Sequence, residues 1–157
     1  MYLISDGGLN CNTKDTIEAI MLTKNSKYDG VKLDVRKSKD NIYVLSRYNE
    51  LSKLTLSNKL VNECNYGYLR KVKFPSHIFK YYIPTLEEIL MKYDKNKIIV
   101  IELYNSDIGD LYSLLDKYSY HYYFLSKNNR TLDKLHQLNF SKLGTIIDNK
   151  SILIKLD

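Results

Sequence analysis

The feature that most constrains the fold is the alternation of short apolar runs with stretches whose apolar residues recur at helical spacing. The apolar runs predict strands over residues 2–4, 30–35, 42–46, 97–103, 120–125, 143–147 and 151–156. The periodic stretches predict helices after a cap at 13–16, after Thr85, and over 107–118 and 129–138. Because strands alternate with helices, the chain is expected to adopt an α/β fold.

Two local signals refine this pattern. The connection Lys37–Asn41 is too short for a parallel crossover, so the strands over 30–35 and 42–46 are expected to form a hairpin that turns at Asp40-Asn41. Thr85 and Glu88 have the spacing of a capping box after Pro84. The stretch 51–82 between these two features is predicted to be looser.

Composition limits the classes of partner. The 157 residues suit one domain over 1–157, and the formal charge of +6 comes from basic residues spread along the sequence, so no nucleic-acid partner is expected. Cys11 and Cys64 lack metal-site spacing, which argues against a disulfide framework or a zinc site. No apolar run is long enough to span a bilayer and no leader opens the chain, so a reducing cytoplasmic setting is expected.

Function must come from polar residues at strand ends, where α/β folds place their ligands. The opening Ser5-Asp6-Gly7-Gly8 follows an apolar run and precedes a capped helix, which is typical of a βα unit with a ligand loop.

Four segments, taken in order, resemble the glycerophosphodiester phosphodiesterase family. They are the opening loop with its capped helix, "YDGVKLDVRKSKDNIYVLSRYNELSKLT", "IPTLEEIL" and "IIVIELY", and together they cover residues 2–104. The resemblance implies a distorted TIM barrel of the phospholipase-C-like type that hydrolyses glycerophosphodiesters. It also implies two histidines as general acid and base, and a divalent cation held by a Glu-x-Asp pair and a later glutamate. An arginine and a lysine would help to hold the phosphate.

The catalytic and phosphate-binding positions depart from that pattern. Asp6 and Gly7 stand where the family has His-Arg, and Arg47 stands at the second histidine. Histidine suits proton transfer because its ordinary pKa is about 6.5, whereas arginine stays protonated. No catalytic residue of the family is therefore intact, and although Asp6 could accept a proton, no matched acid is evident.

The metal positions are altered as well. Lys32 replaces the first ligand of the Glu-x-Asp pair, Asp34 and Glu102 match the other two, and Tyr104 replaces the phosphate-holding lysine. In the Glu-Asn-Thr that opens the first helix only Thr16 remains. An ammonium repels a divalent ion, so our hypothesis is that Lys32 stands in for the metal between Asp34 and Glu102. No cofactor is expected, and calcium or magnesium would bind only if the family site survives.

Three readings of the cluster Asp6, Lys32, Asp34, Arg47 and Glu102 follow. It could be a satisfied ion network in a structural domain whose old site is closed by side chains such as Tyr48 or Tyr104. It could be a site where Lys32 and Arg47 bind a phosphate-containing small molecule without turnover. It could also be an active phosphodiesterase of altered mechanism, acting on glycerophosphodiesters or glycerol-phosphate polymers. We favour a non-catalytic anion-binding or partner-binding domain.

The three histidines of this chain are not expected to replace the family's two catalytic histidines. His77 lies on a loop that could overhang the mouth, while His121 and His136 are expected to be packing or surface residues. The tyrosine-rich "YSYHYYFL" is expected to be a strand with one aromatic face in the core.

Length raises a structural question. A full eight-unit barrel takes roughly 250 residues, so the last βα units are expected to be absent or reduced to residues 151–154. Either the six to seven strands close a small irregular barrel, which we favour, or a partner such as a second copy covers the open edges.

Overall fold

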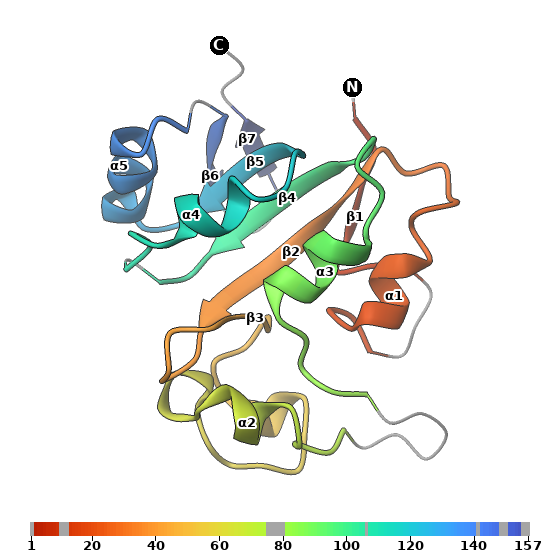
Figure 1. Ribbon diagram of the computed structural model, residues 1–157, viewed down its shortest axis with the longest axis vertical. Coiled ribbons are helices and arrows are strands. Elements are labelled where there is room, and N and C mark those ends of the chain that lie inside the picture. Colours follow the sequence, from red (N-terminus) through yellow and green to blue (C-terminus); the bar gives the residue numbers. More distant parts are fainter. Residues whose placement is uncertain are drawn as a thin grey trace.

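A computed structural model of the chain describes residues 2–9, 13–74, 81–105, 107–140, 142–147 and 151–154 (Figure 1). The predictions about Cys11 and His77 lie outside these residues. In the described part, no helix is both long enough and apolar enough to cross a bilayer.

The described strands form one sheet, in which β1-β2-β4-β5-β6-β7 lie side by side and β3 also pairs with β2. The β1–β2, β2–β4, β4–β5 and β5–β6 pairs are parallel, whereas β3 and β7 are antiparallel to their partners. The strands are β1 Ile4–Asp6, β2 Gly30–Lys37, β3 Tyr43–Leu45, β4 Ile98–Leu103, β5 His121–Ser126, β6 Leu143–Ile147 and β7 Ser151–Ile154.

The helices share one hydrophobic core with the outer face of this sheet. Helices α1, α3, α4 and α5 each contribute buried side chains to that core, so they cover the same face. The helices are α1 Ile17–Met21, α2 Tyr66–Leu69, α3 Leu86–Lys92, α4 Leu111–Leu115 and α5 Asn129–Gln137, with short 3-10 helices η1 Leu51–Lys53 and η2 Val61–Glu63. This is the expected α/β architecture.

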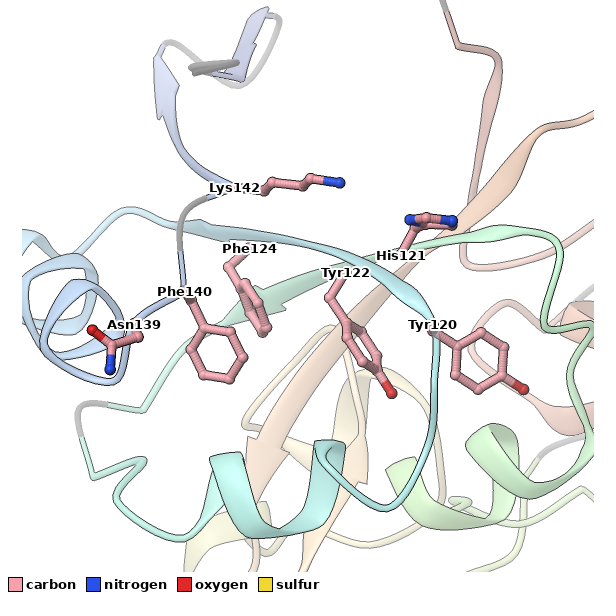
Figure 2. Close-up of a pocket in the computed structure, with 7 residues that line it drawn as sticks. All are labelled: Tyr120, His121, Tyr122, Phe124, Asn139, Phe140 and Lys142. Carbon is pink, nitrogen blue, oxygen red and sulfur yellow. The ribbon is translucent and has the colours of Figure 1, made fainter.

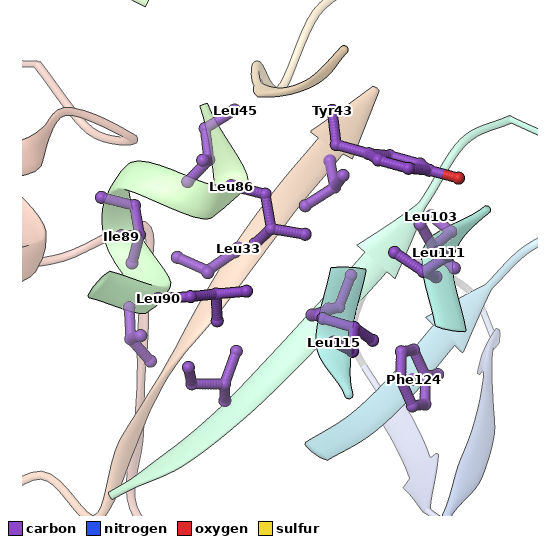
Figure 3. Packing of buried hydrophobic residues seen from close by; sticks show 14 of the residues in the cluster. Leu33, Tyr43, Leu45, Leu86, Ile89, Leu90, Leu103, Leu111, Leu115 and Phe124 are labelled. Atoms are coloured by element: carbon purple, nitrogen blue, oxygen red, sulfur yellow. The ribbon is translucent and has the colours of Figure 1, made fainter. Parts of the chain in front are cut away.

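The core follows directly from the strand alternation. Leu33 of β2 and its outward-facing neighbours are fully buried, and Leu86, Ile89 and Leu90 of α3 pack over them (Figure 3). Leu111 and Leu115 of α4 cover β4 and β5 in the same way (Figure 3). The opposite, inner face carries a small apolar cluster of Ile4, Ile98, Val100, Tyr123 and Leu125, which runs along β4 and β5 as far as Leu125, the residue paired with Glu102.

The predicted hairpin is confirmed. Val35 pairs with Leu45 and Lys37 with Tyr43 in an antiparallel ladder, and Asn41 adopts the positive φ of 63° that its turn needs. Strand β1 pairs with residues 30–32 of the same β2 edge, because β4 occupies the other edge. The segments that follow β1 and β3 therefore meet beside the middle of β2.

The predicted capping box is also confirmed. The hydroxyl of Thr85 accepts a hydrogen bond from the Glu88 amide at 3.0 Å, and the Glu88 carboxylate accepts one from the Thr85 amide at 2.9 Å. These bonds satisfy two otherwise unpaired amides and fix the start of α3.

Several boundaries differ from the predictions. Strand β1 spans Ile4–Asp6 instead of residues 2–4, since the pairing of Ser5 and Asp6 with β2 outweighs local composition. Helix α4 is shorter than 107–118. The stretch 51–82 holds η1, η2 and α2 around a small core of its own, which includes Leu51, Val61 and Leu69. Among the described residues no ladder joins β1 to β7, so closure of the barrel stays a prediction.

Candidate functional site

Strand register brings the charged residues to one place on the inner face. Asp6 pairs with Lys32, and Asp34 pairs with Glu102, near the carboxyl ends of three parallel strands. Because side chains alternate along a strand, these four residues share the face opposite the helix-covered core. Arg47 follows β3, which the hairpin returns to the edge of β2. We refer to Asp6, Lys32, Asp34, Arg47 and Glu102 as the ion cluster.

Lys32 lies at the centre of the ion cluster. Its Nζ is 2.7 Å from Oε2 of Glu102, 3.1 Å from Oδ1 of Asp34 and 3.2 Å from Oδ1 of Asp6. Burial alone would lower the pKa of Lys32, but the attraction of Asp34 and the bond to Glu102 raise it above the usual range. An ammonium group has three protons, so the three carboxylates can use its full donor capacity.

Asp34 is the most buried member of the cluster, with a side chain that is 1% exposed. Besides Lys32 it accepts a hydrogen bond from the Tyr104 hydroxyl at 2.7 Å, and its Oδ2 lies 3.3 Å from Nη2 of Arg47. Burial and the nearby Asp34 charge raise the pKa of Tyr104, which therefore stays a neutral donor. Such a buried carboxylate is stable only because it is fully paired.

Arg47 closes the outer side of the cluster. Its Nη2 lies 2.8 Å from Oδ2 of Asp6 and its Nε lies 3.8 Å from Oδ2 of Asp15. Burial would lower the pKa of Arg47, but Asp15 and Asp34 raise it, so the guanidinium cannot release a proton.

Asp6 is the accessible edge of the cluster, with a side chain that is 45% exposed. Burial would raise the pKa of Asp6, but Lys32 and Arg47 together lower it to about 2. Lys14 lies 3.1 Å from the same carboxylate. Asp6 is consequently an anion at neutral pH and a weak base.

The glycine pair after Asp6 has a steric origin. Gly7 and Gly8 adopt φ values of 70° and 101°, and a Cβ on Gly8 would lie 2.4 Å from the backbone of Ala19. The loop thus passes directly over α1. A Cβ on Gly7 would lie 2.7 Å from Oδ1 of Asp15, so the loop also covers that carboxylate.

Asp15 is a member of the site that sequence reasoning missed. It is 5% exposed, has a positive φ of 63°, and its Oδ1 has no hydrogen-bond partner in the described part of the chain. Burial, with repulsion from Asp34, raises the pKa of Asp15 to about 7. Its burial could not be recognised from its position beside the helix cap, because an aspartate there is ordinarily a solvent-exposed capping residue.

Arg36 was also missed, and it holds the Arg47 segment in place. Its Nε and Nη2 donate at 3.0 Å to the carbonyl oxygens of Ser46 and Arg47, and its guanidinium lies 4.0 Å from the centre of the Tyr104 ring. Strand alternation is the signal that could have identified it, since it puts Arg36 on the inner face with Lys32 and Asp34.

Neither described histidine belongs to the cluster. His121 pairs in register with Ile98, at the opposite end of β4 from Glu102, and His136 is exposed on α5. His121 instead borders a pocket of about 220 Å³, with Tyr122, Phe124 and Phe140 among its lining residues (Figure 2). Tyr122 and Phe124 pack into the helix-side core, which confirms the aromatic face predicted for this strand.

The side chains at the family's metal positions do not fit a divalent cation. The ammonium of Lys32 occupies the space between Asp34 and Glu102, within 3.1 Å of oxygens from both. Among the described residues, no group of three or more His, Cys, Asp and Glu side chains is arranged to hold a metal ion. The arrangement is an internally paired charge network.

Solved structures of similar fold are phosphodiesterases. A glycerophosphodiester phosphodiesterase from Thermotoga maritima superposes with a TM-score of 0.79 at 25% identity, covering 96% of this chain and 64% of that one. One from Agrobacterium tumefaciens gives 0.82 at 19% identity, covering 90% and 65%. A phosphodiesterase from Oleispira antarctica, in complex with the product sn-glycerol-3-phosphate, gives 0.80 at 18%, covering 92% and 64%. The chain thus spans less than two thirds of the length of these proteins.

A comparison of the sequence with protein-family models identifies the family. No curated protein matches the chain significantly. The model of the glycerophosphoryl diester phosphodiesterase family matches residues 7–136, a span that contains β2, β3, β4 and β5 and all of the ion cluster except Asp6. The motifs quoted above and the fold agree with this match, and the chain therefore belongs to the glycerophosphoryl diester phosphodiesterase family.

Proposed function

We propose that this chain is a non-hydrolytic member of its family, in which Lys32 replaces the divalent cation and the former active site is a neutralised ion network. The observation that carries the proposal is the position of the Lys32 ammonium, 2.7 to 3.2 Å from carboxylate oxygens of Glu102, Asp34 and Asp6. The cation that the family takes from solution is here part of the chain.

Proton transfer is the second argument against hydrolysis. Efficient general acid–base catalysis needs groups whose pKa values lie near the working pH. Arg47, at the position of the second histidine, stays protonated, and the pKa of Asp6 is lowered to about 2. The two residues form an ion pair at 2.8 Å rather than an acid and a base. Asp15, whose pKa is raised to about 7, is only 5% exposed beneath Gly7 and is therefore poorly placed to exchange a proton with a substrate.

The second candidate function is binding of a phosphate-containing small molecule by Lys32 and Arg47. It gains support from the Oleispira antarctica relative, whose structure holds sn-glycerol-3-phosphate. In this chain a phosphate would have to displace Asp6 from both cations, at 3.2 and 2.8 Å. Asp6 is the most exposed member of the cluster, so we expect an anion to enter by this exchange.

The direct test is turnover by the purified chain. Glycerophosphodiesters and bis(p-nitrophenyl) phosphate are supplied with calcium, with magnesium and with chelator, and no turnover is expected in any condition. Metal-dependent hydrolysis that disappears in Asp34→Ala and Glu102→Ala would overturn the proposal. A rise in melting temperature with sn-glycerol-3-phosphate, lost in Arg47→Gln, would favour the second candidate.

A gain-of-binding variant tests the role of Lys32 itself. Lys32→Glu restores the family's ligand beside Asp34 and Glu102, and oxygen-rich carboxylate groups are what calcium binds. We expect calcium to stabilise this variant and not the native chain. The matched control is Lys95→Glu, which makes the same charge change at an exposed position. Equal calcium responses in both variants would mean that Lys32 does not occupy the cation position.

The cellular setting and assembly are part of this proposal. A reducing, cytoplasmic setting is supported by Cys64, a buried free thiol. A homodimer that covers exposed strand edges is the proposed assembly if the sheet does not close, and sedimentation of the purified chain would show it.

A further inference from the structure

The segment between β3 and α3 has a surface whose chemistry the ion cluster does not use. Residues 51–74 include five basic side chains and one acidic side chain, a net charge of +4, within a chain whose net charge is +6. Three of the basic residues, Arg70, Lys71 and Lys73, are close together in the sequence, and Lys53 and Lys59 precede them. Folding around η1, η2 and α2 concentrates them in one small lobe.

Within this lobe, Leu56, Lys59, Tyr68, Lys71 and Lys73 form what we call the basic loop patch. The amide of Leu56 donates to the carbonyl of Lys73 at 3.3 Å, and the amide of Lys71 donates to that of Tyr68 at 2.9 Å. The Nζ of Lys59 lies 4.4 Å from the centre of the Tyr68 ring. All five residues are exposed, so the patch is open to solvent.

The apolar member of the patch is unusual. Leu56 is 78% exposed, more than any other large hydrophobic side chain in the described part of the chain. Tyr68 beside it is 40% exposed. Transfer of an exposed leucine side chain out of water is favourable. A tyrosine flanked by lysines is typical of the headgroup region of a bilayer, where its ring and its hydroxyl both find a suitable environment.

We propose that the basic loop patch docks this protein on a bilayer surface that contains anionic phospholipids. The lysines match the negative surface potential, and Leu56 can insert among the acyl chains. A nucleic acid would use the lysines but would leave Leu56 exposed, so the combination favours a bilayer. The proposal concerns binding to the surface and is independent of the chemistry at the ion cluster.

The position of the patch in the fold determines how the docked molecule would be oriented relative to the bilayer. In Figure 1, β2 points toward the lobe that carries α2, so the lobe lies at the end of the sheet where the carboxyl ends of the parallel strands carry the ion cluster. Docking through this lobe would bring that end of the molecule to the bilayer.

The test is sedimentation of the full chain with vesicles of phosphatidylcholine, with and without phosphatidylserine. Binding is expected only with phosphatidylserine and should weaken as salt is added. Lys59→Gln and Lys73→Gln should each weaken it roughly fivefold. Leu56→Ser should weaken it severalfold, and this loss should persist when salt is raised. Lys95→Gln, an exposed lysine on the loop between α3 and β4, is the matched control and should bind as the native chain does.

Other outcomes would overturn the inference. These are equal binding to vesicles without phosphatidylserine, no binding to either vesicle, or an equal loss in Lys95→Gln. Binding of a single-stranded oligonucleotide that is lost in Lys59→Gln but unchanged in Leu56→Ser would assign the patch to nucleic acid instead. All four substitutions change exposed side chains, and circular dichroism would verify that each variant folds. Because they leave the ion cluster intact, failure here would leave the proposed function standing.

Discussion

The two faces of β2 are stabilised by different kinds of interaction. Leu33, on the outer face, is fully buried under α3 and belongs to the main core. Its neighbour Lys32, on the inner face, is held by three carboxylates. One face is thus stabilised by removing apolar surface from water, and the other by pairing charges.

This difference shows how the fold can be retained while the residues of the former active site are replaced. The outer face and the α3 capping box hold the strands in register whatever the inner face carries. The inner face at the strand ends can then exchange acids for bases, provided that each new charge finds a partner. Lys32 between Asp34 and Glu102 satisfies that condition.

The largest effect on this comparison is expected from Lys32→Met. It leaves the carboxylates of Asp34 and Glu102 buried without their cation, and loss of one partner of a buried pair costs about 4 kcal/mol of unfolding free energy. Urea unfolding of the variant and the native chain would measure the loss.

A double variant shows whether the loss is due to unpaired charge. Glu102→Gln alone should also destabilise, whereas Lys32→Met with Glu102→Gln should cost clearly less than the two single losses together. If the losses simply add, or if Lys32→Met costs no more than Lys95→Met, the inner face is not held by pairing.

Leu33→Ala tests the other face of the same strand. Removing a fully buried leucine from the contact with α3 should cost about 3 kcal/mol, through lost transfer free energy and the cavity that remains. Unlike the loss in Lys32→Met, this one should not change with salt or with protonation of the carboxylates. A strong dependence on pH would show that the two faces are coupled.

Asp15→Asn should stabilise the protein, by about 2 kcal/mol near neutral pH. Burial raises the pKa of Asp15 from 3.8 to about 7, so between these values the folded chain holds a proton that the unfolded chain has released. Native stability therefore falls as pH rises through this window, and the variant lacks that fall. Unfolding at several pH values should show the two curves converging toward pH 4.

A gap between the two curves that is independent of pH would contradict the assignment of Asp15 as the titrating group. Asp6 gives an internal comparison, because its pKa is lowered to about 2 and its contribution to stability is lost only as the pH falls toward that value.

The smallest effect is expected from Thr85→Ala. It removes the hydroxyl that accepts a hydrogen bond from the Glu88 amide. The substitution should lower the free energy of unfolding by about 1 kcal/mol without changing the ion cluster. Thr85→Ser keeps the hydroxyl and should recover most of the loss in a thermal unfolding experiment. Failure of the serine variant to recover would point to packing of the threonine methyl group instead of the cap.

Much of the fold was predictable because its signals are local. The short connection before Asn41 required a hairpin, and the Thr85-Glu88 spacing marked the start of α3. Strand β1 was displaced from its predicted position, since its polar end is held by pairing with β2, which no local signal reveals. The lobe over 51–74 was missed because three-residue and four-residue helices leave no periodicity to detect.

The site was predictable only in part. Comparison with the family pattern identified the five residues of the ion cluster, and strand alternation was enough to place four of them on one face. Asp15 escaped because its importance comes from burial beneath Gly7, a fact of tertiary structure. The saturation of Lys32 by three carboxylates likewise depends on distances that spacing along the chain does not give.

The separation of Lys32 from Glu102 along the chain has a kinetic consequence. The two residues form a hydrogen bond across adjacent strands although they are 70 positions apart in the sequence. A long segment must close into a loop before β4 can join β2, and such non-local pairing is slow to form. We therefore expect Lys32 and Asp34 to stay hydrated until β4 joins β2. If so, Lys32→Met should accelerate unfolding far more than it slows refolding, as stopped-flow rates would show. The ion cluster would then control the unfolding rate, and hence the lifetime of the folded state, while it would have little effect on the folding rate.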